Sequence, residues 1–95
     1  MKLVDLEIWK KSRVFRKDIS ALAKSFPDFE KYKLVDQIIR SSRSITANIA
    51  EGHGRFHYQE NIQFCRTARG SLHETFDHLT VALDENISVM MFSKR

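Results

Sequence analysis

Residues 36–54 read DQIIRSSRSITANIAEGHG, and this stretch decides the fold. It begins with the apolar spacing of an amphipathic helix and ends in small residues, with Gly52 and Gly54 two positions apart. Small side chains cannot fill a core with bulk, but they let another backbone come close. The stretch therefore predicts the central helix of a small helical bundle, and its end should set how the neighbouring helices dock.

We expect this helix to run from about residue 30 to residue 51. Its inward positions follow alternating steps of four and three: Leu34, Ile38, Ser41, Ile45, Asn48 and Gly52. Half of these residues are small or polar, so the face predicts either a close neighbour or a hydrogen-bonded feature inside the bundle. A buried Asn48 would fix the helix register. Gly52 and Gly54 should end the helix, since glycine readily takes the left-handed cap conformation.

Two further long helices are predicted, at about residues 5–25 and 58–83. The first carries an apolar stripe with the same spacing and ends at Pro27, because the residue before a proline avoids the α region. The third places Cys65 in its core stripe and Gly70 in mid-helix, where a close helix crossing would make the glycine tolerable. Residues 85–92 are apolar but predict only a short or truncated fourth helix.

The prediction is an all-α fold, an antiparallel up-down helical bundle that fills residues 1–95 as a single domain. A chain of 95 residues with one proline and three glycines fits this class. A monomer of this size would be marginally stable, which leaves room for an oligomer. Cys65 is the only cysteine, and no segment has signal-peptide or membrane-span character, so we expect a cytoplasmic protein without a membrane partner.

The charge is basic and unevenly distributed. The net charge is +4, and residues 1–43 hold 11 Lys and Arg against 6 Asp and Glu. The basic side chains form one stripe on the first helix and another on the second: Lys10, Arg13, Lys17, Lys24, Lys33, Arg40 and Arg43. Such a surface would bind the phosphates of RNA or DNA without reading bases. The alternative on charge alone is a well-solvated surface with a mild lysine excess.

Two blocks of sequence resemble a known family. The first includes SITANIAEG at residues 44–52, and the second is ARGSL at residues 68–72. Together with Phe26-Pro27 and the spacing between Tyr32 and Arg40, they resemble the four-helix-bundle proteins encoded within intervening sequences of bacterial 23S ribosomal RNA genes. The fold also looks like that of the accessory variability determinant of diversity-generating retroelements.

The resemblance implies an antiparallel four-helix bundle that assembles as a pentamer, a homo-oligomer with no catalytic activity. For the retroelement branch it implies a nucleic-acid-binding surface and a reverse transcriptase partner. The match departs from the family at the C-terminus, where members continue through a full fourth helix. A shortened fourth helix would leave an apolar groove along the other three.

No set of residues in the sequence predicts catalysis, a metal or a cofactor. His73 and His78 are five apart, whereas the zinc motif needs histidines four apart on one helix face. Asn48 and Glu51 could form a polar site, but we expect them to be structural, with Glu51 paired to Arg55 or Arg69. Two hypotheses stay open: a nucleic-acid-binding accessory protein, and a self-assembling scaffold that docks a protein partner. We expect no enzyme.

Overall fold

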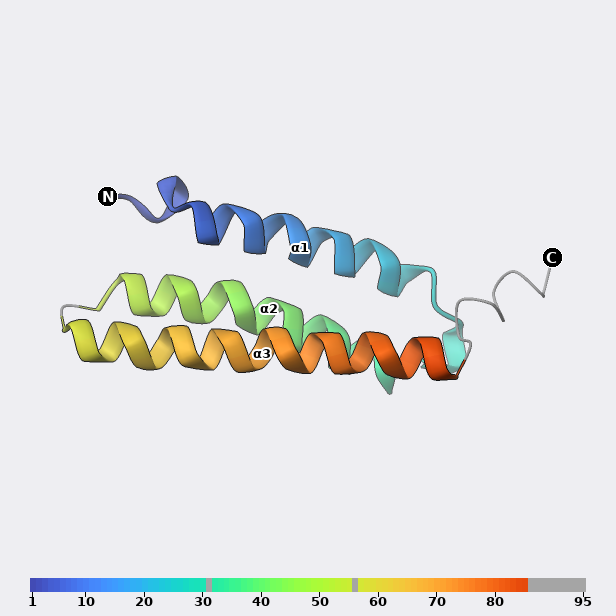
Figure 1. The fold of residues 1–95 in the computed structure, drawn as a ribbon. Helices are drawn as coiled ribbons and strands as arrows, with labels where there is room; N and C mark the ends of the chain where they lie inside the picture. The colour runs from blue at the N-terminus through green and yellow to red at the C-terminus, as the bar shows by residue number, and fades with distance from the viewer. Residues whose placement is uncertain (31, 56, 86–95) are drawn as a thin grey trace.

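The computed structural model describes residues 1–30, 32–55 and 57–85, and within them every regular element is helical. The three α-helices are α1 (Glu7–Lys24), α2 (Leu34–His53) and α3 (Tyr58–Asp84), with short 3-10 turns at Leu3–Asp5 and Asp28–Glu30. Consecutive helices run in opposite directions, and α2 and α3 lie side by side along most of their length (Figure 1). The all-α prediction is confirmed. The short helix predicted at residues 85–92 falls, beyond Glu85, outside the described residues.

The helix ends have local causes. α1 stops shortly before Pro27, as predicted, and a 3-10 turn follows it. α2 begins at Leu34, four residues later than predicted, because residues 28–30 form that turn and the buried Glu30 carboxylate accepts a hydrogen bond from the Leu34 amide at 3.4 Å. α2 ends at the predicted glycines. The prediction of a left-handed cap is wrong, because Gly54 has φ −78° and ψ −5°, in the right-handed α region.

The core is a row of three apolar clusters along the bundle. Phe26, Leu34 and Ala82 form the first, and Ile19, Ala23 and Ile38 form the second. The third joins Ile45, Ile49 and Ala68, with Trp9, Phe15 and Leu72 packed against it. The inward face predicted for α2 is thus confirmed at its apolar positions. The stripe predicted for α1 is only partly correct, because Ile8 is 60% exposed.

The two helical glycines have opposite surroundings. A Cβ atom placed on Gly52 would lie 2.8 Å from the Phe64 Cβ and 2.9 Å from the Asn61 Oδ1, so α3 crosses directly against this residue. A Cβ atom on Gly70 would meet nothing within 4 Å. The close approach predicted from the small end of α2 is confirmed, but the prediction that Gly70 supplies it is wrong. Phe64 and Asn61 are the neighbours.

None of the helices within the described ranges combines the length and the hydrophobicity that crossing a lipid bilayer requires.

Candidate nucleic-acid interface

The basic side chains singled out from the sequence all lie on the surface. Four of them project from α1: Lys10, Arg13, Lys17 and Lys24. Lys33 directly precedes α2, and α2 itself carries Arg40 and Arg43. All seven side chains are exposed. Two of the seven form exposed ion pairs on their own helices: Lys10 with Glu7 at 3.2 Å, and Arg40 with Asp36 at 3.5 Å. Exposed pairs of this kind are worth about 0–1 kcal/mol, so a phosphate could displace either carboxylate.

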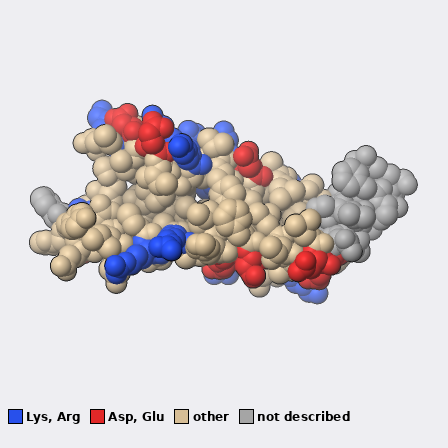
Figure 2. Space-filling view, in the orientation of Figure 1, with Lys and Arg blue, Asp and Glu red and all other residues tan. Residues whose placement is uncertain are grey.

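The structure does not gather these cations into one uninterrupted patch. Along the α1 edge in Figure 2, Lys and Arg atoms are interspersed with Asp and Glu atoms, and the band below that edge is largely uncharged. Arg40 borders a shallow hollow between α2 and α3 together with Glu74, whereas Arg43 borders a different hollow between α1 and α2. The two arginines of α2 therefore lie on different surfaces of the molecule.

The hollow between α1 and α2, which we call the α1–α2 notch, brings basic and aromatic groups of two helices together. It encloses about 550 Å³ and is lined chiefly by Trp9, Arg16, Arg43, Thr46, Ala47 and Ala50. Arg16 Nη1 donates a hydrogen bond to Thr46 Oγ1 at 2.9 Å, which holds the guanidinium between the two helices. Arg13 lies over the Trp9 ring, with its Cζ atom 6.0 Å from the ring centroid.

Arg16 is a candidate that the sequence analysis missed. It lies outside the stripe of Lys10, Arg13 and Lys17, but it follows Trp9 by seven residues and so shares its helix face. That spacing is the signal that could have revealed it. No pattern in the sequence indicates that Arg16 and Arg43, from different helices, border the same hollow.

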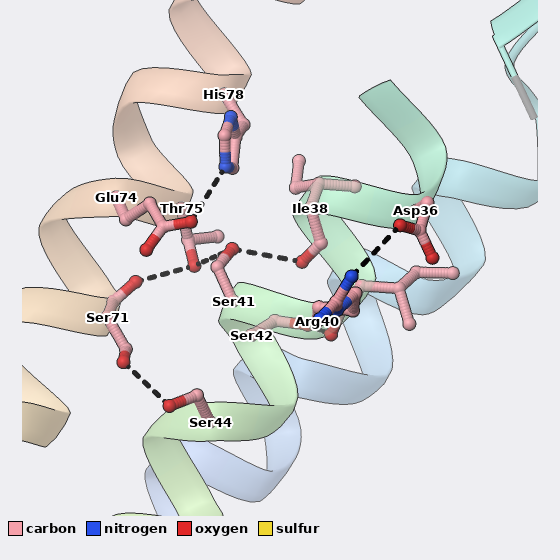
Figure 3. Close-up of polar contacts among 11 residues, drawn as sticks. Asp36, Ile38, Arg40, Ser41, Ser42, Ser44, Ser71, Glu74, Thr75 and His78 are labelled. Atoms are coloured by element: carbon pink, nitrogen blue, oxygen red, sulfur yellow. Dashed lines mark hydrogen bonds and ion pairs between the residues drawn. The ribbon is translucent and has the colours of Figure 1, made fainter. Parts of the chain in front are cut away.

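A hydroxyl-lined seam joins α2 to α3 on the other side of α2 (Figure 3). Ser41 Oγ and Thr75 Oγ1 are 2.8 Å apart, and Ser71 Oγ donates to Ser44 Oγ at 2.8 Å. Ser41 and Thr75 are buried, and Thr75 Oγ1 also donates to the Ser71 carbonyl of its own helix at 2.8 Å. Because these hydroxyls bond to each other across the interface, they serve helix docking.

Asn48 contributes to this seam only indirectly. Its Nδ2 donates to the Ser44 carbonyl at 2.8 Å and to Ser44 Oγ at 2.9 Å, one turn back on the same helix, and the side chain is half-buried. The predicted hydrogen bond inside the bundle is therefore a bond within α2, linked to α3 through Ser44 and Ser71. The prediction for Glu51 is confirmed: it accepts from Arg55 at 2.6 Å, and Arg55 also pairs with Glu60 at 3.5 Å.

In the described part of the chain, the remaining chemically reactive side chains make isolated polar contacts. His78 Nε2 lies 3.2 Å from a Glu74 oxygen, and His53 Nε2 lies 2.8 Å from the Met1 carbonyl. Across residues 1–30, 32–55 and 57–85, no three His, Cys, Asp or Glu side chains are placed to share a metal ion. Cys65 is exposed, so its predicted place in the core is wrong, and its Sγ contacts Asn61 Oδ1 at 3.4 Å.

An apolar groove runs between α1 and α3, with α2 as its floor. It encloses about 450 Å³, and its lining is mostly hydrophobic: Ile8, Phe15, Ile45, Ile49, Ala68 and Leu72. Nothing else among residues 1–30, 32–55 and 57–85 covers this side of the third core cluster, which explains why Ile8 is exposed there and why Cys65 lies at the groove edge.

Comparison with the profiles of protein families identifies the family of this chain. The profile described as "23S rRNA-intervening sequence protein" matches residues 4–90, nearly the whole sequence. The chain belongs to this family. A comparison with curated proteins finds no match.

The residues that first suggested the 23S rRNA-intervening sequence family lie where α2 contacts α3. The two sequence blocks that suggested it, residues 44–52 and 68–72, face each other across α2 and α3, where Ser44 meets Ser71. Ile45, Ile49 and Ala68, from the same blocks, form one core cluster. The blocks therefore account for the docking of two helices. The first block also supplies Thr46, Ala47 and Ala50 to the α1–α2 notch, but the cations of α1, Trp9 and Arg43 lie outside both blocks.

Proposed function

We propose that this family member is a non-enzymatic accessory protein that binds RNA or DNA through the basic surface formed by α1 and the adjoining edge of α2. The observation that carries the proposal is the meeting of cations from two helices at one notch, where Arg16 and Arg43 stand beside Trp9. The exposed Arg13 and Lys17 extend the positive charge along α1. Phosphate contacts of this kind give affinity without base readout.

The finer architecture belongs to this proposal. By its resemblance to four-helix-bundle proteins, the full protein would form an antiparallel four-helix bundle that assembles as a pentamer in the cytoplasm. A ring of five would repeat the basic surface of each subunit and raise the total positive charge, which strengthens phosphate binding. A reverse transcriptase is the partner that the retroelement branch would supply.

Charge reversal at matched positions tests the proposal. The double variant Arg13→Glu/Lys17→Glu changes α1, and Arg66→Glu/Arg69→Glu makes the same charge change at exposed positions of α3. We expect the α1 variant to weaken RNA binding markedly and to reduce the slope of log affinity against log salt by up to about two, whereas the α3 control should change binding less. Helical circular dichroism should be unchanged in both.

Two results would contradict nucleic-acid binding through α1. The first is no binding of single- or double-stranded RNA or DNA by the unmodified protein at about 50 mM salt. The second is an equal or greater loss of affinity in the α3 variant, which would mean that binding depends on net charge or on the hollow of Tyr58, Arg66 and Arg69, and not on α1.

The apolar groove favours a second candidate function, a self-assembling scaffold in which a second copy of the chain covers the groove. About 450 Å³ of mostly hydrophobic lining, with Phe15 and Leu72 at its walls, is the kind of surface that subunit contacts bury. Leu72→Glu should then shift the mass measured by light scattering toward a monomer of 11.1 kDa. An unmodified protein that is already a monomer would exclude this candidate.

A further inference from the structure

The α1–α2 notch brings guanidinium groups of two different helices to one aromatic ring, whereas the hollow of Tyr58, Arg66 and Arg69 is lined by α3 alone. Trp9, Arg16 and Arg43 border the notch, and no carboxylate is among its lining residues. Trp9 packs against the third core cluster and also borders the notch beside two arginines. This combination suits a ligand with a negative group and a planar ring.

Two of these groups are held in place before any ligand arrives. The hydrogen bond of 2.9 Å to Thr46 fixes Arg16, a half-buried side chain that would otherwise lose rotamer freedom on binding. Trp9 packs against the core cluster of Ile45 and Ile49, which anchors the ring. The exposed Arg13 guanidinium lies over the ring, with Cζ 6.0 Å from the centroid, so a base that stacks there takes the place of this guanidinium. A preorganised site loses less conformational entropy when it binds, which raises affinity.

The floor of the notch leaves room for a flat group. Ala47 and Ala50 are one helical turn apart on α2, and both line the notch. Their methyl side chains let a ring approach the α2 backbone more closely than larger residues would. The space of about 550 Å³ is a shallow hollow open to solvent, so a nucleotide would be covered on one side only.

We propose that the α1–α2 notch binds one nucleotide of an unpaired nucleic-acid strand, with the phosphate between Arg16 and Arg43 and the base against Trp9. Arginine suits the phosphate because its planar donors can make two parallel hydrogen bonds to the oxygens. An unpaired strand is required, since bases in a duplex are stacked on each other and cannot present a face to the indole. The inference rests on the proposed nucleic-acid binding and names the strand form that this surface prefers.

Trp9 allows a direct test because it is the only tryptophan in the chain. Tryptophan emission is followed while the full-length protein is titrated with oligouridylate of about 12 nucleotides, and separately with an RNA duplex of similar length. We expect the single strand to quench the emission as it binds. We expect the duplex to bind through phosphates with little quenching.

Two substitutions on α2 separate the notch from general electrostatics. Arg43→Gln removes a cation from the notch, and Arg40→Gln removes one from the hollow that Glu74 borders, three residues away on the same helix. We expect Arg43→Gln to weaken oligouridylate binding about fivefold and Arg40→Gln by less than about twofold, because a charge-assisted bond to phosphate contributes more than a distant charge. Both residues are exposed, so folding should be unaffected.

The outcomes separate the two proposals. Binding of oligouridylate without any change in Trp9 emission would overturn the notch while leaving nucleic-acid binding in place. Equal losses of affinity for Arg43→Gln and Arg40→Gln would do the same. The absence of binding to either RNA would overturn both the notch and the proposed function.

Discussion

Replacing Gly52 by alanine tests whether α2 and α3 are held together by a close backbone approach. In an open helical position, Gly→Ala stabilises a helix by about 0.8–1.0 kcal/mol. Here the added methyl would lie 2.8 Å from the Phe64 Cβ, an atom fixed to its backbone that cannot rotate away. Relief therefore requires the two helices to separate locally, and overpacking of this kind costs about 1–3 kcal/mol.

The matched control is Gly70→Ala. It makes the same chemical change in the same kind of element, but nothing lies within 4 Å of the new methyl. Gly70→Ala should raise the free energy of unfolding by the full helix-propensity gain of about 0.8–1.0 kcal/mol. Gly52→Ala should lower the free energy of unfolding by about 0–2 kcal/mol, because the same gain is offset by the cost of overpacking. The two variants should thus differ by about 1–3 kcal/mol.

The assay is thermal or urea unfolding followed by circular dichroism at one fixed protein concentration, because an oligomer would make Tm depend on concentration. A difference of about 2 kcal/mol corresponds to roughly 10 °C in Tm for a chain of this size, with Gly70→Ala above the unmodified protein. If Gly52→Ala is stabilised as much as Gly70→Ala, the close approach of α3 to Gly52 is not what holds this end of the bundle.

Two further predictions concern the seam. Thr75→Val keeps the volume of a fully buried side chain but removes the hydroxyl that bonds to Ser41, so the free energy of unfolding should fall by about 0.5–1.5 kcal/mol. A double-mutant cycle with Ser41→Ala should show a coupling energy between the two residues. Strictly additive effects of the two substitutions would contradict the hydrogen bond. Asn48→Leu removes hydrogen bonds within one turn of α2 from a half-buried position, so the free energy of urea unfolding should fall by about 1 kcal/mol. RNA binding should be unchanged. Loss of binding by a folded Asn48→Leu variant would make Asn48 a functional residue.

The sequence predicts the helices well because their signals are local. The spacing of Leu34, Ile38 and Ile45 fixes the buried face of α2, and the chain around Pro27 and Gly52–Gly54 fixes where helices end. The misplaced details depend on contacts between helices. Cys65 has the spacing of a buried residue, and Gly70 offered room for a close helix crossing. Both are exposed, because α3 is covered on one side by α2 and elsewhere by little else among the described residues.

The candidate interface is predictable only in part, for the same reason. Exposure of Lys10, Arg13 and Lys17 follows from helical periodicity, since they lie opposite the apolar stripe. Which cations meet is decided by how α1 rotates and crosses α2. Arg16 and Arg43 are 27 positions apart in the chain, and no pattern within one helix could show that both border the same notch.

The seam between α2 and α3 also limits where the chain can change in length. From Ser41 to Gly52, α2 advances eleven residues, and the facing positions on α3 move back by the same eleven, from Thr75 to Phe64. One residue inserted within either stretch would rotate everything beyond it by about 100° and turn the facing hydroxyls and Gly52 away from their partners. We therefore expect insertions and deletions to be tolerated better in the connection between His53 and Tyr58, which lies outside both stretches, than inside the paired helices.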